Sequence, residues 1–332
     1  MKINKNKKFT PPFVILVLAL GILFFMAINI GSLKVSVGEL FRGLFVEHNP
    51  DVATIYDLRF PRVIISMFAG AALAVSGTLL QAVLKNPLAD PGIIGVSSGA
   101  GFFAVVFMAM FPTLFNFVPF AGFLGGVFAF FLVYKLSWKQ GFSPLRILLV
   151  GIAVQSLFTG LSNSFGAVSG GNLSGVASIV EGNINMKTWD DVYTLMMYVI
   201  PGLLIAFMCA KSCDLLLLED KTVRSLGIDI NQKRFRISMV AVLLAASTTS
   251  IVGVIGFLGL LVPHIARLLI GNKHKSLIPF SMFLGAFIFL LADTVGRSIM
   301  PPFEISGSVI MSVIGGPVFI MLLRKEGSIN GK

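Results

Sequence analysis

The chain has 332 residues, of which 56% are hydrophobic and only 12% are charged, and its formal net charge is +11. Because a soluble domain carries about 25% charged residues, this composition excludes a soluble globular protein and predicts a polytopic membrane protein. No basic stretch is interleaved with aromatic residues, so we attribute the positive charge to membrane topology and expect no nucleic-acid partner.

Ten apolar stretches predict membrane-spanning helices, which makes the expected fold class an all-α polytopic membrane protein. They cover residues 11–31, 62–84, 92–111, 117–136, 145–167, 191–210, 236–256, 258–271, 277–297 and 305–323. The stretch 258–271 is short for a span, so full crossing and a re-entrant path both stay open. We expect one transmembrane domain over residues 1–332, with a charged cytoplasmic segment at about 211–236.

The basic residues between these stretches indicate how the chain is oriented. With the N-terminus inside, 20 of the 26 Lys and Arg residues lie in inner segments and six in outer segments. This distribution follows the positive-inside rule and predicts that both termini are cytoplasmic. Cys209 and Cys213 are one helical turn apart with no His or further Cys nearby, which predicts membrane-boundary thiols and no metal site or disulfide.

The first outer segment ends in LRFPR, where Arg59 and Arg62 flank Pro61. Pro61 fits the first turn of a helix, so both arginines are expected to project from the outer mouth of the second span. They could anchor the helix at the interface, or they could bind carboxylates of an external partner. We favour the partner because outer positive charge opposes the topology signal.

The next segment combines small residues with helix breakers. Gly70, Ala74 and Gly77 allow close helix packing in the second span, and Asn86-Pro87 and Asp90-Pro91-Gly92 predict two turns. Irregular backbone near membrane depth is tolerated only where it is buried in protein or lines a water-filled path. The residues that follow are therefore candidates for a translocation path or gate: Gly95, Ser97, Ser98 and Gly99.

The charged segment 211–236 predicts a short amphipathic helix beginning at Asp220. Val223 and Leu226 would share one face, and Gly227 would end the helix in a left-handed conformation. A docking element for a cytoplasmic partner and a solvated linker are equally good interpretations of this pattern.

Two polar residues in apolar stretches are candidate proton sites. His264 has no Cys or carboxylate within reach in the sequence, which favours a structural hydrogen bond. Asp293 lies one helical turn before Arg297, which favours a local ion pair near the outer end of its helix.

Several of these stretches, taken in order, resemble the FecCD-type permeases of binding-protein-dependent ABC importers, which carry ferric siderophores, haem or cobalamin. The matching stretches are LRFPR, GAALAVSGTLLQAVLKNPLADPGIIGVSSGAG, VRSLGI, GFLGLLVPHIARLLIG and LLAD..GR. The resemblance implies a cobalamin-importer-permease-like fold of ten helices in the bacterial cell membrane. It also implies a second permease subunit, identical or related, two copies of a cytoplasmic ATP-binding subunit, and an extracytoplasmic substrate-binding protein.

The resemblance also implies roles for particular residues. Arg59, Arg62 and Arg297 would meet glutamates of the binding protein. The residues that would contact the ATPase are Asp220, Arg224, Ser225, Leu226 and Gly227. Relatives usually carry a Trp and a Gly-Ser-Leu run before the outer Trp, whereas this chain reads IVEGNINMKTW, so the role of the 168–191 loop stays open.

The chain lacks the G-x-x-x-x-G-K-[ST] loop, so ATP would be bound and hydrolysed by a separate subunit. We therefore expect a transport subunit that is not itself an enzyme, has no cofactor, and works by alternating access. A ferric siderophore is the first expected substrate, with haem second and cobalamin third. The rival hypothesis is an ion-driven secondary transporter that uses Asp293 or His264; a membrane enzyme has little support.

Overall fold

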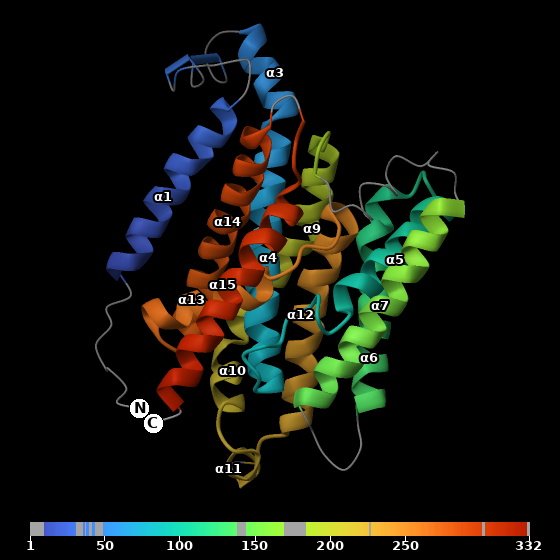
Figure 1. Ribbon diagram of the computed structural model, residues 1–332, viewed down its shortest axis with the longest axis vertical. Coiled ribbons are helices and arrows are strands. Elements are labelled where there is room, and N and C mark those ends of the chain that lie inside the picture. Colours follow the sequence, from blue (N-terminus) through green and yellow to red (C-terminus); the bar gives the residue numbers. More distant parts are fainter. Residues whose placement is uncertain are drawn as a thin grey trace.

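The computed structural model describes residues 10–30, 36, 38–39, 42–43, 49–137, 144–168, 184–225, 227–300 and 303–330. Within these ranges the chain is a bundle of helices. An isolated β-bridge joins Met300 to Phe303. Most long helices run roughly along one axis, with α3 at one end of the bundle and α11 at the other (Figure 1).

Each of the ten predicted spans coincides with a helix. The described helices are α1 (Thr10–Asn29), α3 (Pro50–Leu58), α4 (Phe60–Leu84), α5 (Val96–Met110), the 3-10 turn η1 (Phe115–Phe117), α6 (Val118–Ser137), α7 (Pro144–Val168), α9 (Trp189–Met208), α10 (Ala210–Leu216), α11 (Asp220–Ser225), α12 (Ile230–Val252), α13 (Leu258–Ile270), α14 (His274–Ile299) and α15 (Gly307–Asn330). Among the described residues, seven helical stretches are long and apolar enough to cross a membrane, and α5, α13 and the first part of α15 are shorter apolar helices. The all-α polytopic fold is thereby confirmed.

Helix α4 forms the centre of the bundle. Nearly all of its 25 residues are buried, against α14, α12, α13 and α9. A Cβ atom added to Gly70 would collide with the backbone of Gly285 on α14, and one added to Gly77 would collide with that of Gly259 on α13. The predicted close packing of small residues on α4 is therefore confirmed. At these two positions the backbone of α4 lies directly against the backbones of α14 and α13.

Two predicted helix boundaries differ from the structure around non-helical segments. The third span begins at Val96 rather than residue 92, because the Asp90 carboxylate accepts hydrogen bonds from the backbone N–H groups of Gly92 (2.7 Å) and Ile93 (3.3 Å) and holds a turn. The seventh span ends at Val252, and residues 253–257 lead without helix into α13. With 13 residues, α13 rises about 20 Å and cannot cross a bilayer core alone.

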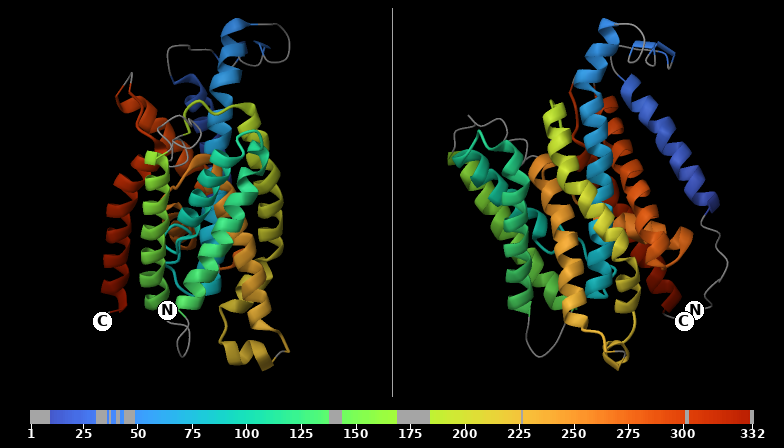
Figure 2. Two further views of the ribbon diagram at one scale, coloured as in Figure 1. Left: turned by 90° about the vertical axis from the view of Figure 1, so that its right-hand side faces the viewer. Right: turned by 180° about the vertical axis from the view of Figure 1, so that it is seen from behind.

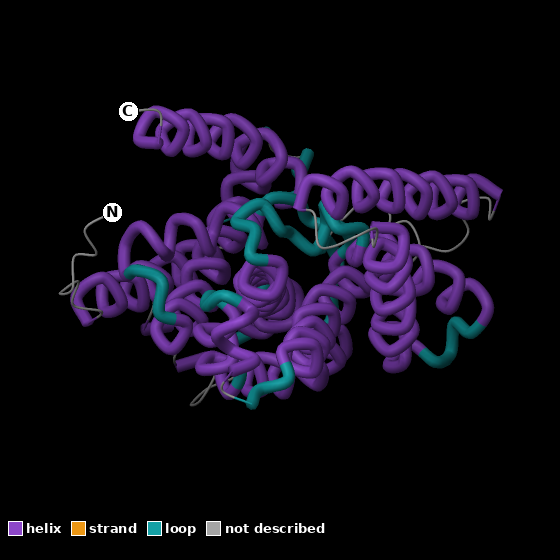
Figure 3. The backbone as a smooth tube through the Cα atoms, turned by 90° about the horizontal axis from the view of Figure 1, so that it is seen from below, coloured by secondary structure: helices purple, strands orange, loops and turns teal. Residues whose placement is uncertain are grey.

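The views from the side and from the α11 end place α7 and α15 along the same edge of the bundle (Figures 2 and 3). Helix α15 ends toward the end of the bundle where α11 lies, and the first residues of α1 face in the same direction (Figure 1). Most of the 168–191 loop, namely residues 169–183, lies outside the described residues.

Candidate functional site

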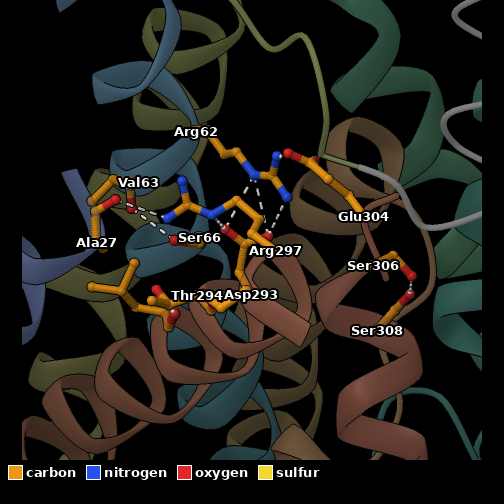
Figure 4. Close-up of polar contacts among 12 residues, drawn as sticks. Ala27, Arg62, Val63, Ser66, Asp293, Thr294, Arg297, Glu304, Ser306 and Ser308 are labelled. Carbon is orange, nitrogen blue, oxygen red and sulfur yellow. Dashed lines mark hydrogen bonds and ion pairs between the residues drawn. The ribbon is translucent and has the colours of Figure 1, made fainter. Parts of the chain in front are cut away.

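A cluster of buried charges lies at the α3 end of the bundle, where α4 begins (Figure 4). Arg62 binds the Asp293 carboxylate of α14 with two nitrogens, Nη2 at 2.8 Å and Nε at 3.1 and 3.2 Å. Its third nitrogen, Nη1, donates to Glu304 Oε2 at 2.6 Å. Asp293 is fully buried, so its charge depends on these partners for stabilisation.

Two further arginines attach the end of α1 to this cluster. Arg297 places Nε 3.5 Å from Asp293 Oδ2 and donates from Nη2 to the carbonyl of Ala27 at 3.0 Å. Arg59 donates from Nη1 to the carbonyl of Ile28 at 2.7 Å. The last carbonyls of a helix lack intrahelical partners and lie at its negative end, so guanidinium groups are suitable partners for them.

The predicted ion pair between Asp293 and Arg297 is confirmed. Of the two arginines expected to project from the mouth, Arg62 is buried, and Arg59 is only partly exposed and is bound to the Ile28 carbonyl. Arg62 is only 7% exposed, and the Arg297 side chain is 6% exposed. A buried arginine needs a nearby acid, and Asp293 and Glu304 meet that need. The role of the three arginines in docking a binding protein stays a prediction.

A small polar pocket lies between α5 and α7, on the edge that α7 shares with α15. Its volume is about 40 Å³, and it is lined by Ser98, Gly101, Val105, Thr159, Ser162, Asn163 and Val254. Thr159 and Asn163 are also exposed on α7. Polar side chains facing lipid are unfavourable, so this side of α7 is suited to a water-filled path or a protein partner.

Of the four candidate gate residues, only Ser98 lines this pocket. Ser97 is fully buried. Gly95 has a φ of +84° and packs against Val154 and the backbone of α7, where a Cβ would be tight. Gly99 packs against α6 at Gly125. The irregular start of α5 is therefore a tight junction beside the pocket, which is one of the two outcomes the sequence left open.

The predicted short helix of the charged segment is confirmed as α11, from Asp220 to Ser225. Val223 is its buried residue, and Gly227 follows with a φ of +74° and donates its N–H to the Arg224 carbonyl at 3.0 Å. Leu226 lies outside the described residues.

The Asp220 carboxylate binds two basic side chains from other parts of the chain. Its Oδ1 accepts from Lys85 Nζ at 2.8 Å and from Arg234 Nη2 at 3.1 Å. The hydrogen bond from Lys85 is the largest cause that holds the pKa of Asp220 below its usual value. The sequence did not predict this contact, because Lys85 and Asp220 are 135 positions apart.

A second side-chain contact joins α10 to the start of α14. Asp214 Oδ1 accepts from the backbone N–H of His274 at 3.0 Å and lies 2.7 Å from its Nδ1. Cys209 and Cys213 are both free thiols near the junction of α9 and α10. In the described part of the chain, no group of three or more His, Cys, Asp and Glu side chains could hold a metal ion.

Residues 18–325 match the FecCD transport family. The chain is 38% identical over 319 residues to IsdF of Staphylococcus aureus, which is named a probable haem-iron transport system permease protein, with 96% of this chain and 97% of the relative covered. A solved structure of a metal-chelate type ABC transporter in an inward-facing conformation matches with a TM-score of 0.80 and 29% identity, covering 95% of this chain and 99% of that one.

PsaBC from Streptococcus pneumoniae, solved in complex with Fab, has the same fold, with a TM-score of 0.61 and 17% identity over 86% of this chain and 95% of that one. The family match spans nearly the whole chain and includes the three arginines at the α3 end, the turns before α5, and α11. Permeases of this kind work with an ATP-binding subunit, a substrate-binding protein and a second permease subunit. The chain belongs to the FecCD transport family and is a multi-pass permease subunit of an ABC importer.

Proposed function

We propose that the chain imports iron bound in an organic chelate, with a ferric siderophore as the first candidate and haem as the second. The observation that carries the iron chelate is the similarity to IsdF over 96% of the chain. That relative's name is also the specific reason to keep haem, while cobalamin is the third candidate.

The chemistry of the pocket beside α7 favours the siderophore. Its polar side chains are the hydroxyls of Ser98, Thr159 and Ser162 and the amide of Asn163, and none of the described residues that line it is His, Cys, Tyr or Met. Hydroxyl and amide groups can hydrogen-bond to the oxygen-rich surface of a ferric chelate. A haem, whose porphyrin face is mostly apolar, would gain less from these hydroxyl and amide groups.

Each proposed partner is assigned to one region of the bundle, namely one of its two ends or the edge formed by α7 and α15. Two copies of an ATP-binding subunit would contact the cytoplasmic α11 segment, around Asp220, Arg224, Ser225, Leu226 and Gly227. The binding protein would dock over Arg59, Arg62 and Arg297. A second permease, identical or related, would cover the edge of α7 and α15, so that the path lies between the two subunits.

The two substrates are separated by uptake in a bacterial strain that lacks its own iron-chelate permeases. The strain would express this chain with its ATP-binding subunit and binding protein, and would be supplied with ⁵⁵Fe as a hydroxamate siderophore or as haem. We expect the siderophore to be taken up, with uptake abolished by an ATP-binding subunit that cannot hydrolyse ATP. Uptake of haem alone would select the second candidate. Uptake that continues without hydrolysis and stops with an uncoupler would refute the ABC mechanism.

A further inference from the structure

Lys85 ends helix α4 in an unusual backbone conformation. Its φ of 48° and ψ of 34° lie in the left-handed region. Among the described non-glycine residues, the others with a positive φ are Met186 and Phe257. Glycine is the usual residue in this conformation at a helix end, because a Cβ atom is unfavourable there. The presence of lysine suggests that its side chain has a use that outweighs this disadvantage.

The side chain of Lys85 reaches the segment that forms α11. Its Nζ donates to the Leu218 carbonyl at 2.5 Å and to Asp220 Oδ1 at 2.8 Å. The same carboxylate oxygen accepts from Arg234 of α12 at 3.1 Å. Asp220, the first residue of α11, is therefore joined to the ends of two core helices.

Helix α11 has few other attachments. It projects beyond the ends of the other helices (Figures 1 and 2), and of its six residues only Val223 is buried. The Lys85 and Asp220 side chains are 33% and 39% exposed, so their pair adds little to the stability of the fold. Its contribution is to fix where α11 sits relative to α4.

We propose that Lys85 is a positioning residue that couples displacement of α11 to α4 and to the turns before α5. Lys85 directly precedes the segment 86–95, which ends at Gly95 against α7. A push on α11 therefore reaches the tight junction beside the polar pocket through one side chain. The inference rests on the proposed function, because it assumes that an ATP-binding subunit moves α11.

The test uses the complete transporter, with its ATP-binding subunit and binding protein, reconstituted in liposomes. Lys85→Gly removes the amine and relieves the backbone, Lys85→Met removes the charged amine but keeps an unbranched side chain of similar length, and Lys85→Arg keeps a charged donor. Lys211→Met is the matched control, since Lys211 is an exposed lysine on α10 outside the proposed contact. The readouts are chelate imported per ATP hydrolysed and hydrogen exchange of the α11 backbone amides.

We expect Lys85→Gly and Lys85→Met to lower chelate import per ATP by about threefold to fivefold, within the range that one partly exposed ion pair can supply. Both should also speed hydrogen exchange in α11, while Lys85→Arg and Lys211→Met should resemble the wild type. Unchanged exchange in Lys85→Gly and Lys85→Met, or an equal loss of coupling in Lys211→Met, would overturn the proposal. If the wild-type complex imports no chelate, the proposed function fails, and hydrogen exchange alone still decides whether Lys85 holds α11.

Discussion

Replacing Asp293 by asparagine tests whether the buried charge cluster holds the α3 end of the bundle together. The wild-type cluster pairs two cations, Arg62 and Arg297, with two anions, Asp293 and Glu304. Asp293→Asn keeps the shape of the side chain but leaves two buried guanidinium groups with one half-exposed carboxylate. Breaking a buried ion pair in this way costs about 3–5 kcal/mol, because the remaining charge is not compensated.

The assay is reversible unfolding of the detergent-solubilised chain. It measures how much each substitution lowers the free energy of unfolding relative to the wild type. Glu304→Gln is the matched comparison, because it removes one carboxylate that also contacts Arg62 but whose side chain is 39% exposed. Its expected cost is only about 1 kcal/mol, since water can replace part of the contact. A cost for Asp293→Asn no greater than that for Glu304→Gln would refute the idea that Asp293 stabilises this end of the bundle.

Three further changes probe other parts of the molecule. Gly77→Ala would force a Cβ into the backbone of Gly259, so we expect it to destabilise the fold by about 1–3 kcal/mol in the same unfolding assay. In Gly227→Ala the added methyl group meets no neighbour, but the residue must adopt a φ of +74°, which costs about 1–2 kcal/mol locally. We expect the free energy of global unfolding to be unchanged and chelate import per ATP in liposomes to fall. Asn163→Leu removes a polar group from the exposed side of α7, so chelate uptake should fall without loss of assembled permease, measured by uptake and by size-exclusion chromatography. Normal uptake in Asn163→Leu would exclude this pocket from the path.

The helices could be predicted from the sequence because long apolar stretches are a local signal, whereas several helix ends could not. Hydropathy marks where a helix is apolar, but capping decides where it begins. Helix α12 starts at Ile230, six residues before the predicted span, because the Asp229 side chain accepts hydrogen bonds from the N–H groups of Asn231 (2.9 Å) and Gln232 (3.1 Å). The first turns of α12 are charged, so an apolar pattern does not include them.

The candidate sites divide in the same way into local and distant features. The positive φ of Gly227 and the pairing of Asp293 with Arg297 follow from neighbours in sequence and were predicted. The pairing of Arg62 with Asp293 joins positions 231 apart, and no local pattern specifies which two helices meet. The sequence offered only a weaker indication of this pair. Arg62 and Asp293 each lie in an apolar stretch, on the same side of the membrane in the predicted topology, and buried charges require partners.

Helix α4 is the element that connects these sites, because it begins at the buried charge cluster at the α3 end of the bundle and ends at Lys85. Its 25 residues span about 37 Å, comparable to the thickness of a bilayer. Between its ends, Gly70 and Gly77 bring its backbone against α14 and α13, so α4 cannot slide past either helix without separating backbone atoms. We therefore expect a conformational change that reaches α4 to move α4, α13 and α14 together, with bending in non-helical segments such as 86–95 and 253–257. The pocket beside α7 is lined by Val254 from one of these segments and by residues that follow the other, which places it where such a movement would change its shape.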